Sequence, residues 1–410
     1  MDEESFRRFM RQAMDGGEPG FGSQPIDGAV RAAGRIRRRR MLAGASATAT
    51  AAALIGTATL AFGASGSGGN GPPTAAAARF AYVANTFKGT LTPISIATNT
   101  PGKPIRVGPD PTQMAVTPDG RTIYVVNSAS SGTVTPVSTA TNKTGKPIKV
   151  AGSPYTIIMT PNGRTVYVGG LFEGIVTPIF TRTNKAGQPI IVGGKHSMVS
   201  MVMTPDGRTI YAVSGSDAVT PISTATDKAG RAIKTGAGET GIVITPDGRT
   251  IYVESASGTV TPISTATGKV GKPIKVGKRP GFMQATPGTV YVISDPGTVT
   301  PISTATNTAG TPIKVGKGAS DMAVTPDEMT VYVANFDSAD TVTPISTATN
   351  TAGKPIAVGG EPSFVFVTPD GKTAYVSDWT VGQVTPVSTA TNTAGMPIRL
   401  AGAQEIVFAP

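Results

Sequence analysis

Residues 134–151 read VTPVSTATNKTGKPIKVA, and close variants of this stretch recur down the chain. Each copy places a proline inside a β-branched run typical of a strand. Seven of the eight copies place a second proline just before another such run. Because proline has no N–H to give a sheet, it is tolerated only on edge strands and at bulges. The pattern therefore predicts the outer, water-facing edge of a small sheet, where proline and a nearby Lys or Arg prevent pairing with another molecule.

The repeat has the length of a propeller blade. Eight of the nine tyrosines recur at intervals of 39 to 44 residues, which is the period of a four-stranded blade. One copy predicts strands within 113–120, 121–127, 132–139 and 146–151, with a tight turn at TPDG (117–120). Since no copy contains a helix-length apolar pattern, helical and leucine-rich solenoids are excluded. The recurring tyrosines are predicted to pack between blades.

The two ends of the repetitive region, 79–410, complete each other. It opens with RFAYVAN (79–85), a second strand that lacks its first, and it closes with EIVFAP (405–410), a first strand that stops at the turn. Pairing these two segments completes one blade and closes the ring. The sequence thus predicts an all-β, eight-bladed β-propeller of four-stranded blades closed by the N- and C-terminal strands. Seven blades are the alternative.

The first 78 residues are of a different kind. Residues 1–40 carry nine arginines, 41–63 contain no charge, and 64–78 are a flexible linker of Gly, Ser, Pro and Ala. The segment 41–63 is long enough for a transmembrane helix, and the arginines before it place 1–40 in the cytoplasm. Arg38-Arg39-Arg40 also resembles a twin-arginine export signal that is cleaved. Both alternatives place 79–410 outside the cytoplasm, either at the cell membrane or secreted.

Composition limits the chemistry that the chain can perform. It has no cysteine and one histidine, so thiolate metal sites, disulfides and sites with two imidazoles are excluded, and no metal or cofactor is expected. The formal net charge is +11, but 20 of the 27 Lys and Arg residues of 79–410 belong to the repeat itself. That distribution indicates edge protection, and it argues against nucleic acid as a partner because no aromatic residues are interleaved for base stacking.

The loops fall on two faces, because successive strands alternate in direction. The TPDG turns and the STATN loops form one face and are nearly identical between copies, whereas the loops of the opposite face differ in length and chemistry. We call these the uniform face and the variable face. Variation of this kind is what a composite binding surface around a central funnel requires. The candidate binding residues are Phe87, Lys88, Tyr155, Phe172, Glu173, His196, Asp217, Glu254, Arg279, Asp295, Phe336, Asp337, Asp378 and Trp379.

The motifs YVAN (82–85, 332–335), TPDG before a Tyr-Val strand, and STATN followed by PIKVG resemble the YVTN-type β-propeller repeat family. The resemblance covers 79–410 and implies a surface propeller, more distantly related to lactonase-like propellers; many members have seven blades. The resemblance, the segment 41–63 and the variable face together lead us to expect an exported, membrane-tethered module that binds an extracellular protein or ligand, such as a cell-wall glycan or peptide, with Trp379 and Phe336 in contact with it. One alternative is a lactonase-like hydrolase using carboxylates such as Glu254 and Asp295, with Arg279 or His196, in the funnel. The other is a structural protein of the cell envelope.

Overall fold

The computed structural model describes residues 78–410, except 129–131, 195–197, 216, 237, 338–339 and 379. The side chains of residues 239 and 240 are also outside the description. The predicted cytoplasmic segment, membrane span or export signal, and linker therefore lie outside the described residues, apart from Ala78. Within the part of the chain that is described, no helix is long and apolar enough to cross a membrane.

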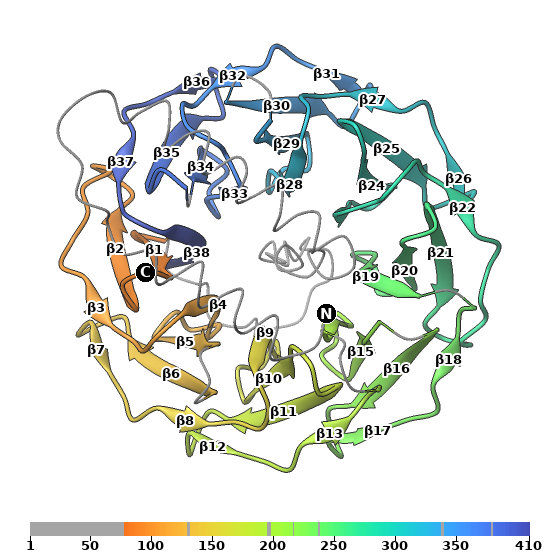
Figure 1. Ribbon diagram of the computed structural model, residues 1–410, viewed down its shortest axis with the longest axis horizontal. Helices are drawn as coiled ribbons and strands as arrows, with labels where there is room; N and C mark the ends of the chain where they lie inside the picture. Colours follow the sequence, from red (N-terminus) through yellow and green to blue (C-terminus); the bar gives the residue numbers. More distant parts are fainter. Residues whose placement is uncertain are drawn as a thin grey trace, which may run out of the picture. The chain divides into compact units, whose positions relative to one another are not determined.

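Eight sheets stand around a common axis and form a closed ring (Figure 1). The predicted fold, with eight blades rather than seven, is confirmed. From the axis outward, blade 1 contains β38 (Ala403–Ala409), β1 (Phe80–Asn85), β2 (Thr90–Ser95) and β3 (Ile105–Arg106). Blade 2 contains β4 (Pro111–Val116), β5 (Thr122–Asn127), β6 (Thr133–Ser138), β7 (Lys143–Thr144) and β8 (Ile148–Lys149). Blade 3 contains β9 (Pro154–Met159), β10 (Thr165–Gly170), β11 (Ile175–Phe180), β12 (Lys185–Ala186) and β13 (Ile190–Ile191).

The remaining five blades follow in chain order. Blade 4 contains β14 (Ser200–Met203), β15 (Thr209–Val213), β16 (Ala218–Ser223), β17 (Lys228–Ala229) and β18 (Ile233–Lys234). Blade 5 contains β19 (Glu239–Ile244), β20 (Thr250–Ser255), β21 (Thr259–Ser264) and β22 (Ile274–Lys275). Blade 6 contains β23 (Met283–Ala285), β24 (Thr289–Ser294), β25 (Thr298–Ser303), β26 (Thr308–Ala309) and β27 (Ile313–Lys314). Blade 7 contains β28 (Ala319–Val324), β29 (Thr330–Asn335), β30 (Thr341–Ser346), β31 (Thr351–Ala352) and β32 (Ile356–Ala357). Blade 8 contains β33 (Phe364–Val367), β34 (Thr373–Asp378), β35 (Gln383–Ser388), β36 (Thr393–Ala394) and β37 (Ile398–Arg399).

The two ends of the propeller close the ring, as the sequence predicted. Strand β38 pairs antiparallel with β1, with Phe80 opposite Ala409 and Val83 opposite Ile406. The last residue, Pro410, packs on Gly120, where a Cβ would lie 2.2 Å from the proline Cδ. Four prolines of the TPDG-type turns make the same contact with the glycine of the next blade: Pro118 with Gly163, Pro161 with Gly207, Pro205 with Gly248 and Pro326 with Gly371. Pro410 therefore takes the place of a turn proline in blade 1.

The outer edge of each blade explains the prolines, and it corrects one prediction. In the six blades other than 1 and 5, the single predicted outer strand is two short pieces; in blade 2, Thr144 pairs with Val137 and Ile148 pairs with Val134, so the outer segment contains one extra residue. Pro136 lies at this bulge, and its carbonyl accepts a hydrogen bond from Gly145 N at 2.7 Å on the outer side. Because the N and C=O of one strand residue point to the same side, the missing N–H also faces the bulge.

A hydrogen-bonded latch joins each blade to the next. A buried tyrosine of the second strand donates its hydroxyl to the Asn or Asp side chain of the following blade's STATN-type loop, and Tyr375 of blade 8 reaches Asn99 of blade 1. The acceptor residues have φ near +50°, a conformation that Asn and Asp tolerate better than other side chains. Their distances are 2.5–2.9 Å, for the pairs Tyr82–Asn142, Tyr124–Asn184, Tyr167–Asp227, Tyr252–Asn307, Tyr291–Asn350, Tyr332–Asn392 and Tyr375–Asn99.

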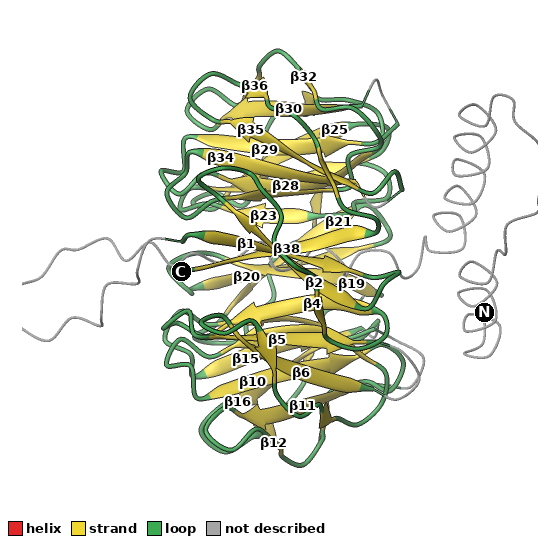
Figure 2. Cartoon of the chain, turned by 90° about the vertical axis from the view of Figure 1, so that its left-hand side faces the viewer, coloured by secondary structure: helices red, strands yellow, loops and turns green. Residues whose placement is uncertain are grey.

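Apolar side chains fill the space between adjacent blades. One cluster joins Tyr82 and Leu91 of blade 1 with Met114 and Ile123 of blade 2, all fully buried or nearly so. The prediction that the recurring tyrosines pack between blades is confirmed. Loops gather at the two ends of the strands, as Figure 2 shows, so each face of the ring carries one set of loops.

Deleting residues 405–410 tests closure by the two ends. The deletion removes the inner strand of blade 1 and the burial of Ile406, Val407 and Phe408. Since each buried apolar side chain contributes roughly 1.5–3 kcal/mol, we expect the free energy of unfolding in urea to fall by at least about 3 kcal/mol. Deleting Pro410 alone is the control and should cost far less. Equal unfolding curves for the longer deletion and the intact chain would contradict closure.

Candidate functional site

Six of the predicted candidates lie exposed on loops of the variable face. Phe87 is 56% exposed on the β1–β2 loop. Arg279 and Asp295 form an ion pair, with 2.8 Å between the Nη2 and Oδ2 atoms, at the base of the β24–β25 loop. These residues present a mixture of aromatic and charged groups to solvent. The exposed set is Phe87, Lys88, Asp217, Arg279, Asp295 and Asp337.

Two predicted acids hold the shape of their own loops. The Glu173 carboxylate accepts hydrogen bonds from the backbone N–H of Ser153 at 3.2 Å and of Phe172. The Asp378 carboxylate is buried and accepts from Thr380 N at 2.8 Å, from Val381 N at 3.1 Å and from Glu361 N. A carboxylate engaged by several N–H groups is a loop anchor. Both side chains position the variable face.

The predicted carboxylate pair of Glu254 and Asp295 has two unlike environments. Glu254 is completely buried within β20 rather than on a loop, and its carboxyl group packs against Gly241, where a Cβ would lie 2.9 Å from its Cδ. Asp295 is exposed and paired with Arg279. Glycine at 241 is therefore needed to make room for the Glu254 side chain. Phe172 and Phe336 are partly buried in their loops, and His196 and Trp379 lie outside the described residues.

A group of acids on the innermost strands was not among the sequence candidates. Asp321 of β28 and Glu405 of β38 are each 4% exposed. The Asp321 Oδ2 atom accepts a hydrogen bond from Val365 N of blade 8 at 2.8 Å. Gln113 occupies the corresponding position in β4 and accepts from Ile157 N of blade 3 at 3.3 Å. These side chains thus connect neighbouring inner strands, and carboxyl groups replace the amide in two blades.

Burial shifts the pKa values of the inner-strand acids, and the charge of Asp321 adds to the shift of Glu405. Burial raises the pKa of Asp321 to about 8, against the weaker opposing effect of its hydrogen bond from Val365 N. Burial, and then the charge of Asp321, raise the pKa of Glu405 well above its ordinary value. Tyr155 of β9, a predicted candidate, has its pKa raised to about 12 by burial and then by Asp110 and Glu405. Carboxyl groups that stay protonated near neutral pH can donate a hydrogen bond or a proton. Aligning the repeats on their TPDG turns could have drawn attention to Asp321 and Glu405.

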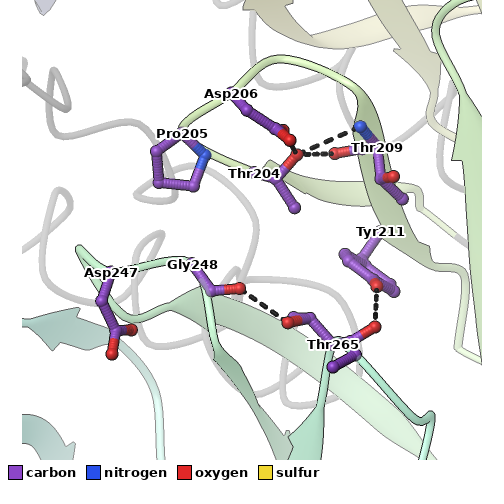
Figure 3. A pocket seen from close by; sticks show the side chains of 9 residues that line it. Thr204, Pro205, Asp206, Thr209, Tyr211, Asp247, Gly248 and Thr265 are labelled. Carbon is purple, nitrogen blue, oxygen red and sulfur yellow. Dashed lines mark hydrogen bonds between the residues drawn. The ribbon is translucent and has the colours of Figure 1, made fainter.

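A groove of about 330 Å³ opens between blades 4 and 5 on the uniform face (Figure 3). It adjoins the one latch that lacks an acceptor side chain, because Gly268 of blade 5 stands where the other blades have Asn or Asp. Tyr211 consequently donates to the Thr265 backbone carbonyl at 3.1 Å. The hydroxyl groups of Thr204 and Thr265 are likewise bonded to Asp206 and to the Gly248 carbonyl. The donors drawn in Figure 3 are thus engaged within the protein.

The chain is an all-β, eight-bladed propeller, and comparison with known proteins supports this fold. No family model and no curated protein matches it. Dihydro-heme d1 dehydrogenase NirN in complex with DHE is similar, with a TM-score of 0.70 and 15% identity over 82% of this chain and 76% of that chain. Hydrazine synthase of Kuenenia stuttgartiensis has a TM-score of 0.53 and 23% identity over 76% of this chain and 93% of that chain. At these identities the similarity shows the fold alone.

Replacing Asp321 with Asn tests the inner-strand acids through pH. Because the folded pKa of about 8 lies above the unfolded value of about 3.9, the folded state binds the proton more tightly, and stability falls as pH rises between these values, by at most about 1.4 kcal/mol per unit. The Asn variant retains an acceptor for Val365 N and does not ionise. We expect urea unfolding to show that Asp321→Asn gains stability over the wild type between about pH 5 and pH 8.

Asp119 provides the opposite control. A hydrogen bond from Thr117 lowers its pKa, so its charged form contributes stability above its unfolded pKa, and that contribution is lost as pH falls through its folded pKa. The Asp119→Asn variant should therefore lose stability relative to the wild type at neutral pH and lose less in acid. A pH-independent difference for Asp321→Asn would contradict the raised pKa.

Restoring the missing latch tests its energetic role. Gly268 has φ +66°, which Asn adopts at the equivalent positions, and a Cβ there would lie in ordinary contact with Ile233 at 3.5 Å. We expect Gly268→Asn to raise the free energy of unfolding by about 1 kcal/mol, through a Tyr211 hydrogen bond and a less flexible unfolded chain. Gly268→Ala introduces a side chain that is strained at this φ and offers no acceptor, so it should lower the free energy of unfolding. A Gly268→Asn protein no more stable than Gly268→Ala would argue against the latch.

Proposed function

We propose that the propeller is an exported binding module that captures a partner outside the cell through its variable face. One contrast carries this proposal. On the uniform face the recurring polar side chains are engaged in latches and turns, such as Thr117 with Asp119 at 2.6 Å. On the variable face Phe87, Asp217 and Asp337 are exposed, and their blades differ in what they present. A surface whose chemistry changes from blade to blade suits recognition of one asymmetric partner.

Residues 1–63 and the repeats support the location of the protein, and the exposed loop residues support the class of its partner. The arginines of 1–40 and the uncharged segment 41–63 support export, with tethering to the membrane or release after cleavage. The YVTN-type repeats support a surface protein. Exposed aromatic and acidic groups suit sugars and peptides, so we infer a cell-wall glycan or peptide as the partner, with Trp379 and Phe336 as further candidate contacts.

A second candidate function is hydrolysis near the axis, of the lactonase-like kind. The observation that favours it is the presence of two buried acids, Asp321 and Glu405, because burial raises the pKa of Asp321 to about 8. A carboxyl group that stays protonated near neutral pH can act as a general acid. The two similar solved structures are named as a dehydrogenase and a synthase, so this fold also accommodates enzymes.

Substitution of the variable face distinguishes the two functions. We expect a Phe87→Ala, Asp217→Asn, Asp337→Asn variant to bind soluble cell-wall glycan fragments and peptides about tenfold more weakly, because truncating most interface residues costs less than about 1 kcal/mol each and the three losses add. Binding is measured by calorimetry, and the melting temperature should not change. Arg121→Gln with Arg208→Gln, which alters exposed residues of the uniform face, is the control. Undiminished binding would contradict the proposal, whereas turnover of a lactone probe that Asp321→Asn abolishes would support hydrolysis.

A further inference from the structure

Positive charge is unevenly distributed over the outer edges of the blades. Every outer edge needs the same protection from pairing, yet the outer segments of blades 2, 4 and 5 carry three cations each, whereas those of blades 6, 7 and 8 carry one each. Edge protection explains one cation in each blade, but it does not explain the additional cations of the other blades. We define the basic wall by the eleven cations of blades 1, 2, 4 and 5: Lys103, Arg106, Lys143, Lys146, Lys149, Lys228, Arg231, Lys234, Lys269, Lys272 and Lys275.

The basic wall is exposed and is not neutralised by its own segments. Each of its side chains is exposed to solvent, while the isoleucine before the last cation of each blade, such as Ile148 and Ile274, packs inward. The outer segments of these blades contain one acid, Asp227, and its carboxylate accepts the Tyr167 hydroxyl. Among the described residues, none of the ion pairs in the structure includes a residue of the basic wall. Its charges therefore add to one another.

We propose that the basic wall binds a linear polyanion bearing phosphate groups, which follows the circumference of the ring. Lysine predominates in the wall, and its ammonium group binds phosphate as a hydrated point charge without strict geometry. Such contacts suit a flexible chain of repeated anionic groups and give binding that salt weakens. Aromatic side chains are not interleaved with these cations in the outer segments, so recognition of stacked bases is not part of the site.

The arrangement of the wall favours a polymer over a membrane. Strands β7, β8, β17, β18 and β22 lie on the perimeter of the ring (Figure 1). Blades 1 and 2 are separated from blades 4 and 5 by blade 3, so the cations face outward in several directions. A flat bilayer touches a convex wall along one or two blades, whereas a flexible chain bends around it and engages all four. The wall is distinct from the variable face and does not depend on the function proposed for that face.

A matched pair of triple variants tests this site. The wall variant is Lys269→Gln, Lys272→Gln, Lys275→Gln, and the control variant is Lys314→Gln, Lys354→Gln, Arg399→Gln, which removes the same charge from blades 6, 7 and 8. Both retain residues 1–40. Binding of the purified full-length proteins to long-chain inorganic polyphosphate is measured by fluorescence anisotropy over a range of salt concentrations, and thermal melting checks that both variants are folded.

We expect the wall variant to bind polyphosphate roughly 10- to 100-fold more weakly at about 0.1 M salt, with the slope of log K against log salt reduced by about 2, since each lost contact contributes roughly 0.7. The control variant should lose less than about threefold. Equal losses of polyphosphate affinity in the two variants would show an effect of net charge and would overturn the proposal. Affinity that does not change with salt concentration would also overturn it. Two further probes complete the test. If the protein binds anionic phosphatidylglycerol vesicles, or single-stranded DNA at equal phosphate, more tightly than polyphosphate, the ligand of the wall is a membrane or a nucleic acid and not the proposed polymer.

Discussion

The hydrogen bond from each blade's tyrosine to the next blade's loop sets the geometry of the whole ring. The hydroxyl lies at the end of a buried side chain, where an unsatisfied donor would cost about 1–3 kcal/mol. An Asn or Asp with φ near +50° brings its side-chain oxygen to that hydroxyl at seven of the eight interfaces. Because the donor belongs to one blade and the acceptor to the next, the latch fixes how adjacent blades are rotated. Closure then follows when Tyr375 reaches Asn99 of blade 1.

This constraint explains why variation is confined to one face. Seven of the STATN-type loops present an acceptor side chain to the preceding blade, and several turn prolines pack on the next blade's glycine, as Pro118 does on Gly163. The uniform face therefore cannot change without loosening an interface. The described loops of the variable face share a backbone hydrogen bond within each blade, such as that from Val150 N to Gly132 O at 3.2 Å, and this bond leaves the side chains around it free to differ between blades. Blade 5 is the exception: Gly268 retains the backbone conformation, and the Tyr211 hydroxyl donates a longer hydrogen bond to the Thr265 carbonyl.

The fold could be predicted from sequence because its signals repeat. In-strand prolines at 39- to 43-residue intervals, a bulge-tolerant edge and two complementary ends identify a closed ring of blades. The latches could not be predicted, since each joins residues of consecutive copies and Asn is equally common in turns. Asp321 and Glu405 interact only because closure brings blades 7 and 1 near each other. Glu173 and Asp378 resembled ligand-binding acids, but the backbone N–H groups that engage them are invisible in sequence.

The electrostatics of the ring follow from where each charge is buried. Burial near the axis raises the pKa of Asp321 to about 8, so this acid carries little negative charge near neutral pH, and burial also raises the pKa of Glu405 well above its ordinary value. Asp119 and its counterparts at the turns stay ionised, with their pKa lowered by a threonine hydroxyl, but each lies beside its own arginine or lysine where one follows. Neither group of acids therefore offsets the outer edges. The lysines there are exposed to solvent and separated from the axis by three strands, so their field is directed outward, toward whatever anions surround the protein.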